Sequence, residues 1–100
     1  MRIEFHAEAA AELFEAKQWY DKQSESLGVR FFNEIDHAII TIQAAPLRWS
    51  LYKNDIHRFH IRRFPYSIIY RVNDNRIQII AVMHQKRRPF YWKQRTENTI

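Results

Sequence analysis

Cationic and aromatic residues gather in the second half of the chain, where their chemistry suits an anion or a flat partner surface. They are densest from His84 to Arg95, and Arg58, Arg62, Arg63 and Arg71 precede that run. Guanidinium forks pair with phosphates and carboxylates, and aromatic rings stack on bases or fill the centres of protein interfaces. The residue types therefore predict a binding surface in this half of the chain.

A structural role explains the same residues equally well by type alone. In that interpretation the rings of residues 90–92 fix a last helix to a sheet, and Lys86, Arg87 and Arg88 form a solvated turn. The role of His84 is equally undecided, because a histidine at a strand end is either a structural residue whose hydrogen bonds are satisfied or a general base.

Metal, thiol and nucleotide-loop chemistry find little support in the sequence. His57 and His60 lie three apart in a predicted strand, so they point to opposite faces and do not form a local pair of metal ligands. The chain has no cysteine, which removes disulfide scaffolds and thiolate zinc sites. Its only glycine is Gly28, so glycine-rich phosphate loops are excluded. We expect neither a metal nor a cofactor.

The charge of the 100 residues is unevenly divided between the two halves of the chain. Residues 1–50 carry five Lys and Arg against eight Asp and Glu, whereas residues 51–100 carry eleven against three. A basic half of this kind indicates a polyanionic or acidic partner, although a solvated basic face is an alternative. The length predicts a single domain over residues 1–100, and no apolar run is long enough to span a membrane.

The first half of the chain predicts a short strand followed by two amphipathic helices. Residues 2–5 alternate as a strand, and the apolar residues of the first helix repeat at helical spacing at Ala9, Leu13, Ala16 and Tyr20. Glu8, Glu12 and Glu15 share another face of that helix, which we expect to be solvated. A second helix, with Ser24 or Ser26 as its N-cap, ends before Pro46. The two helices form an antiparallel hairpin.

The second half predicts three antiparallel strands and a short last helix. Alternation of apolar and polar residues begins at Ile56, Pro65 opens the next strand, and residues 73–75 have the chemistry of a hairpin turn. The strand over residues 76–85 is apolar on both faces, so we expect it to be central. Pro89 is placed to start a helix that runs to Thr96.

Two stretches of the chain carry a family resemblance. Residues 56–72, with Phe64-Pro65-Tyr66, and residues 79–92, with a His-x-x-Arg-x-Pro-x-x-Trp pattern from His84 to Trp92, resemble the signature of the RelE/ParE toxin family on its ParE-like side. Trp19-Tyr20 and Pro46 also have counterparts in the family, so the resemblance extends over the whole chain. His57 departs from it, since family members often carry a second arginine there.

The resemblance implies an α+β fold with an N-terminal strand, a helical hairpin packed on a mostly antiparallel four-stranded sheet, and a short C-terminal helix. It also implies the toxin of a bacterial type II toxin–antitoxin module, active in growth inhibition and plasmid stabilization in the cytoplasm. ParE-like members bind DNA gyrase, whereas RelE-like members cleave mRNA on the ribosome. While the toxin is inactive, its expected partner is a cognate antitoxin with an acidic, amphipathic segment. The resemblance also implies a homo- or hetero-oligomer with the antitoxin, and no membrane is involved.

Two sets of residues follow from these alternatives. The favoured ParE-like interpretation has no catalytic residue, and its target-binding surface comprises Arg62, Lys86, Arg87, Arg88, Tyr91, Trp92 and Arg95. A RelE-like nuclease needs a base, an acid and cations for the phosphorane charge, and its candidates are Arg58, Arg63, His84, Arg88 and Tyr91. A basic interaction module that no longer inhibits growth is the third possibility.

Overall fold

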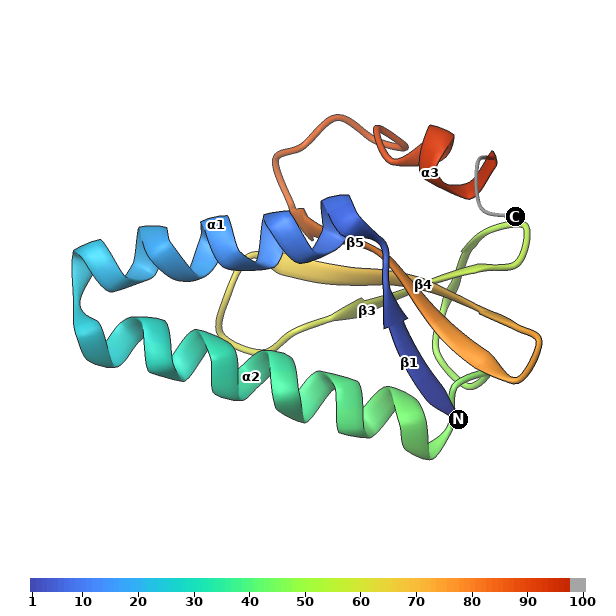
Figure 1. Ribbon diagram of the computed structural model, residues 1–100, viewed down its shortest axis with the longest axis horizontal. Helices are drawn as coiled ribbons and strands as arrows, with labels where there is room; N and C mark the ends of the chain where they lie inside the picture. The colour runs from blue at the N-terminus through green and yellow to red at the C-terminus, as the bar shows by residue number, and fades with distance from the viewer. Residues whose placement is uncertain (98–100) are drawn as a thin grey trace.

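The computed structural model describes residues 1–97 and shows an antiparallel helical hairpin packed on one face of a five-stranded sheet (Figure 1). The order of elements agrees with the sequence prediction except for one additional strand after the hairpin. In chain order they are β1 (Arg2–Phe5), α1 (Ala7–Gln23), α2 (Glu25–Ala44), β2 (Leu51–Lys53), β3 (Ile56–His60), β4 (Tyr66–Asn73), β5 (Arg76–His84) and α3 (Lys93–Glu97).

The sheet has the strand order β1-β5-β4-β3-β2, in which β1 is parallel to β5 and the other pairs are antiparallel. The prediction of four strands was wrong, because β2 adds a fifth at the edge beside β3. This strand has only three residues and an irregular register, so its sequence shows no alternation that would reveal it. β5 lies between β1 and β4, one place from the middle of the sheet.

The turn between α1 and α2 is very short. Ser24 ends α1 by donating its backbone N–H to the Tyr20 carbonyl, and it also precedes the first residue of α2. Gly28 is buried in the first turns of α2, where a Cβ atom would overlap the Asp21 carboxylate. The single glycine of the chain thus permits a close approach of the two helices.

The main core lies between the hairpin and the sheet. Ala9, Ala16 and Tyr20 of α1 are buried in it, as the predicted stripe requires. Tyr70 of β4 is fully buried, and its hydroxyl donates a hydrogen bond of 2.6 Å to the Pro46 carbonyl, which fixes the chain just beyond α2. The core residues are Ala9, Ala16, Tyr20, Phe31, Ile35, Ala38, Ile42, Ile61, Ile68, Tyr70, Ile77, Ile79 and Val82.

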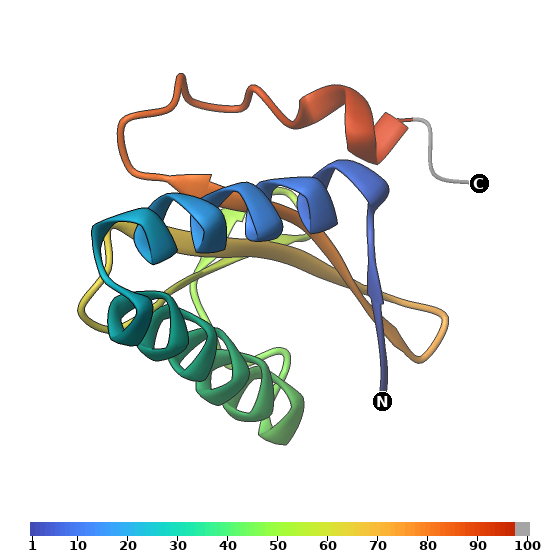
Figure 2. The same cartoon turned by 60° about the vertical axis from the view of Figure 1, so that its left-hand side comes forward.

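A smaller core lies on the opposite face of the sheet and is covered by residues 85–97, which we name the C-terminal arm. After β5 the arm runs back past the N-terminal half of α1 (Figure 2). Its Trp92 is buried against sheet residues that include Ile69 and Ile80. The predicted helix start at Pro89 was wrong, since Phe90 has φ 62° and α3 begins only at Lys93. A left-handed residue interrupts any helix.

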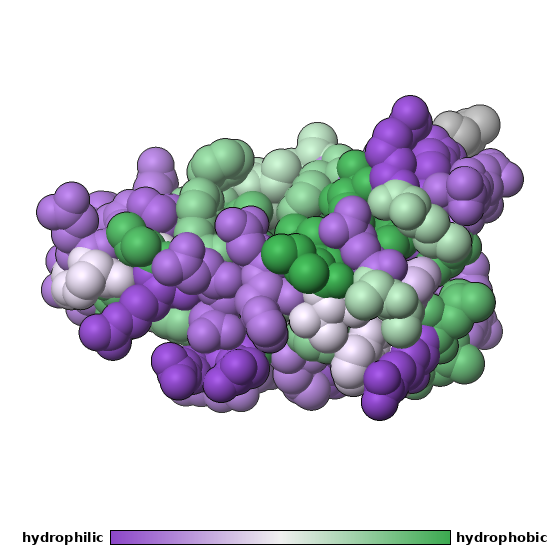
Figure 3. Space-filling model, turned by 90° about the horizontal axis from the view of Figure 1, so that it is seen from below, coloured by the Kyte–Doolittle hydropathy of each residue, from purple (hydrophilic) through white to green (hydrophobic). Residues whose placement is uncertain are grey.

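Seen from the side of α2, the surface mixes polar residues with separate apolar patches (Figure 3). Several large apolar side chains from α2 to β2 are exposed, including Ile40, Leu47 and Leu51. Scattered exposed apolar residues are ordinary for a folded domain and by themselves indicate no binding site.

Candidate interaction site

Glu12 of α1 is the centre of a hydrogen-bonded cluster that joins the C-terminal arm to the hairpin. Its carboxylate accepts hydrogen bonds from the Tyr91 hydroxyl at 2.7 Å and from Arg95 Nη1 and Nη2 at 2.9 and 3.0 Å. The Arg95 and Glu12 side chains are only 10% and 15% exposed. Two parallel bonds from a guanidinium in such a shielded place are among the stronger polar interactions in proteins. We name Glu12, Tyr91 and Arg95 the arm clamp.

The arm clamp also satisfies backbone groups that β5 leaves without a strand partner. β1 pairs with β5 only as far as Ile79, so the Val82 N–H beyond it donates to Glu12 Oε1 at 3.0 Å instead. A register irregularity sits opposite Ile69 and Tyr70, and the Ile80 carbonyl in it accepts from Arg95 Nη1 at 3.0 Å. Buried backbone groups require partners, and here two side chains replace the missing strand.

The prediction that the glutamates of α1 form a solvated stripe was therefore wrong for Glu12. Glu8 is 66% exposed and meets Arg95 Nε at 3.3 Å, and Glu15 is exposed. The partners of Glu12 lie 70 or more positions away in the sequence, so helical periodicity carries no signal for its role.

Tyr91 is committed to the arm clamp. Burial, together with its hydrogen bond to Glu12, raises the pKa of its phenol far above the ordinary value. The Arg87 guanidinium lies over its ring, with the central carbon 3.8 Å from the ring centroid. The fixed ring thus supports an exposed cation, an arrangement that favours a preformed contact.

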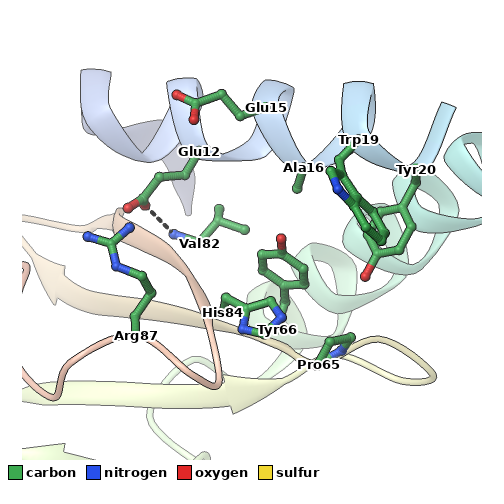
Figure 4. Close-up of a pocket in the computed structure, with 10 residues that line it drawn as sticks. All are labelled: Glu12, Glu15, Ala16, Trp19, Tyr20, Pro65, Tyr66, Val82, His84 and Arg87. Carbon is green, nitrogen blue, oxygen red and sulfur yellow. Dashed lines mark hydrogen bonds between the residues drawn. The ribbon is translucent and has the colours of Figure 1, made fainter. Parts of the chain in front are cut away.

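A cleft of about 510 Å³ opens between α1 and the ends of β4 and β5, next to the arm clamp (Figure 4). Trp19 and Tyr20 lie at one end of it and Arg87 at the other, with Tyr66 and His84 between them. Trp19 is 58% exposed although it borders the cleft. The residues that line the cleft are Glu12, Glu15, Ala16, Trp19, Tyr20, Pro65, Tyr66, Val82, His84 and Arg87.

His84 and Tyr66 give the middle of the cleft a donor character. The Lys86 backbone N–H donates to His84 Nδ1 at 3.0 Å, so the neutral imidazole carries its proton on Nε2. The two rings contact edge to face, 5.0 Å between centroids. Burial and the nearby Tyr20, Glu12 and Glu15 raise the pKa of Tyr66, which keeps its hydroxyl protonated.

The residues predicted for a nuclease do not share one cavity in the described part of the chain. His84 lines the cleft beside α1, while Arg63, at φ 68°, lines a different one with Arg30 and Glu34 of α2. Arg58 lies over the Tyr52 ring on the arm side of the sheet, 5.0 Å from its centroid.

The residues predicted for a target-binding surface fall into three groups. Arg62, Lys86, Arg87 and Arg88 are exposed. Tyr91 and Arg95 support the arm from inside, through the arm clamp. Trp92 is only 2% exposed and packs beneath the surface, with Tyr52 and Phe90 around it.

Two further findings apply to residues 1–97. No group of three or more His, Cys, Asp or Glu side chains is arranged to hold a metal ion in this part of the chain. None of its helices combines the length and the apolar character needed to cross a bilayer.

Comparison of the fold with solved structures gives a clear match. The chain is similar to one titled "Chromosomal ParDE TA system from P. aeruginosa", with a TM-score of 0.73 and 18% sequence identity over 84% of this chain and 95% of that one. A search of curated proteins found no match.

Comparison with protein-family models shows to which family the sequence is related. Residues 3–89 match the model described as the ParE toxin of the type II toxin–antitoxin system parDE. The match includes α1, the sheet and the cations Lys86, Arg87 and Arg88, and it stops before Tyr91 and Arg95. The sequence resemblance to the RelE/ParE toxins is thus confirmed on its ParE side: the chain belongs to the ParE toxin family of type II toxin–antitoxin systems.

Proposed function

We propose that this ParE-type toxin inhibits growth by binding DNA gyrase in the cytoplasm, without catalysing a reaction, and that a cognate antitoxin neutralises it. The observation that carries the proposal is the presentation of Lys86, Arg87 and Arg88. All three are exposed, and none forms an ion pair within residues 1–97. Exposed cations held on a braced segment favour contact with an acidic partner surface.

The position of Tyr91 weighs against the alternative of a ribosome-dependent nuclease. A general acid for the leaving oxygen needs a free hydroxyl with a pKa near the working pH. The Tyr91 hydroxyl is bound to Glu12, and its pKa is raised further from that range. His84 and Arg63 line separate cavities, so these two nuclease candidates are not brought to one point; the cation that shares the cleft with His84 is Arg87.

A supercoiling assay with purified gyrase and relaxed plasmid tests the proposal. The wild-type chain should block supercoiling, and a variant with both Arg87→Glu and Arg88→Glu should need at least about tenfold more protein for the same effect. Arg48→Glu reverses one charge, half of the change in the double variant, at an exposed arginine beside Trp49 and should behave as wild type.

Full supercoiling at saturating wild-type protein would refute gyrase as the target. In that case, mRNA cut at codon-related positions in a translation extract would establish the nuclease alternative. Induced expression without growth arrest would instead indicate a basic interaction module that is no longer toxic.

A further inference from the structure

We propose that the cavity between α2 and the turn that joins β3 to β4 binds a phosphate ester of the size of a nucleotide. Arg30 and Arg63 hold the phosphate group. This cavity shares no lining residue with the cleft beside α1. The site goes beyond the proposed function, since neither the gyrase target nor the antitoxin enters into it.

Two arginines from separate elements line this cavity. Arg30 belongs to α2, and Arg63 belongs to the turn, which passes beside that helix (Figure 1). Both residues are exposed, and neither forms an ion pair within residues 1–97. Two guanidinium groups without a counter-charge repel each other, and a bound anion removes that repulsion. Because each guanidinium is a fork of N–H donors, an oxyanion with several acceptor oxygens suits the pair.

The backbone of Arg63 is held in an unfavourable conformation. Its φ is 68°, in the left-handed region that costs energy for any residue with a Cβ atom. The turn is fixed on both sides, since the Ile61 N–H donates to the Tyr66 carbonyl at 3.1 Å and the Phe64 ring meets that of Phe31 with 5.2 Å between centroids. Glycine would adopt this conformation without cost. Strain that the surrounding core maintains is concentrated at binding sites, and here it falls on a residue that lines the cavity.

The rest of the cavity favours a phosphate ester over a bare phosphate ion. Its volume is about 300 Å³, which one phosphate group does not fill and which is the lower end of the range for small-molecule sites. Leu27 and Phe64 give it apolar surface, and Asn33 and Glu34 add an amide and a carboxylate. Apolar walls with a few polar groups suit the base and the sugar hydroxyls of a nucleotide.

Glu34 lines the same cavity and carries a negative charge. It forms no ion pair with either arginine, so its carboxylate opposes a bound anion. Glu34→Gln removes the charge and keeps an acceptor oxygen for the sugar. This variant should therefore bind the phosphate ester about threefold more tightly than wild type.

Titration of the purified chain with AMP, followed by amide NMR shifts, tests the inference. AMP should bind with a Kd of about 1 mM or below, and adenosine, which lacks the phosphate, at least about tenfold more weakly. Arg30→Gln and Arg63→Gly should each raise the Kd for AMP by about tenfold. Arg63→Gly should keep the fold, because glycine accepts the φ of 68°. Arg62→Gln removes the neighbouring exposed charge, which does not line the cavity, and should stay within about twofold of wild type.

A second titration, with a 5′-phosphorylated tetranucleotide, identifies the source of the phosphate. Tighter binding of AMP would support a free nucleotide as the ligand, and tighter binding of the tetranucleotide would support the end of a nucleic-acid strand.

The proposal is overturned if AMP shows no saturable binding up to about 10 mM. An equal loss of affinity in Arg62→Gln and Arg63→Gly would overturn it as well, because anions would then be attracted by the basic surface in general. Neither result bears on the supercoiling assay, so this site and the gyrase target are refuted by different experiments.

Discussion

The carboxylate of Glu12 makes most of the polar contacts between the first helix and the last segment of the chain, and Glu8 adds one longer contact to Arg95. We expect Glu12→Gln to lower the free energy of unfolding by about 3 kcal/mol, because it leaves the Arg95 guanidinium in a shielded place with less compensation. Arg95 keeps its contacts with Glu8 and the Ile80 carbonyl, so we expect the loss at the lower end for a broken buried pair.

Urea denaturation measures this effect, and Glu15→Gln on the same helix is its control. Glu15 is exposed, so that variant should differ from wild type by less than about 0.5 kcal/mol. Hydrogen exchange of residues 89–97 should also become faster in Glu12→Gln only. Equal stability of the two variants would contradict the arm clamp.

The buried phenol of Tyr70 makes stability depend on pH in the alkaline range. Burial raises the pKa of Tyr70 to about 12, whereas an unfolded tyrosine titrates near 10. The unfolded chain thus loses its proton first, and the contribution of this group, complete below about pH 10, is lost as the pH rises towards 12.

Tyr70→Phe should therefore flatten the decline in stability between about pH 10 and 12. It should also lower stability at neutral pH by about 1 to 2 kcal/mol, because the Pro46 carbonyl loses its donor. Some decline remains, since burial also raises the pKa values of Tyr20, Tyr66 and Tyr91. Unfolding curves across this range that are parallel for wild type and variant would refute the assignment to Tyr70.

Among the elements, the hairpin between β4 and β5 shows local sequence dictating local structure. Asp74 and Asn75 have φ values of 52° and 61°, the left-handed pair of a type I′ turn. Asn75→Ala should cost about 1 kcal/mol, because alanine tolerates this region less well than asparagine. Asn75→Gly should be at least as stable as wild type. Thermal unfolding measures both, and the reverse order of stability would contradict the turn assignment.

Elements with a strong period or a turn signal were predictable from the sequence, and elements fixed by distant contacts were not. The α1 stripe and the turn at residues 73–75 depend on neighbours within a few positions, so the sequence carries their signal. The three residues of β2 are a strand only because β3 lies beside them.

The functional candidates divide in the same way. Arg87 was a candidate because of the charge density and the family pattern, and the structure shows that it is exposed. The burial of Glu12 was not, since Val82, Tyr91 and Arg95 reach it only after the sheet and arm have formed. Trp19 was recognised as part of a family pattern, but its place on a cleft depends on Tyr66 and His84, which come from the other half of the chain.

At the scale of the whole molecule, the two halves of the chain differ in charge. Residues 51–100 supply most of the cations, and the structure places several of them on the arm, outside the helical hairpin. In the acidic first half, Glu12 forms an ion pair with Arg95 inside the molecule. The exposed charged residues of the arm are Lys86, Arg87, Arg88, Lys93 and Glu97, so its exposed surface is net basic, and this asymmetry favours steering of an acidic partner.

Salt should therefore slow association with the antitoxin much more than it weakens the fold. Raising the ionic strength from about 0.05 to 0.5 M shortens the Debye length well below 10 Å, which screens the exposed arm cations but not the shielded pair of Glu12 and Arg95. We expect the association rate to fall by about tenfold and the dissociation rate to change less, because steering acts on encounter. Stopped-flow mixing measures both rates, and Arg87→Glu should lower the rate at low salt and flatten its salt dependence. An association rate that is independent of salt in the wild type would show that the basic surplus of this chain does not serve recognition of its antitoxin.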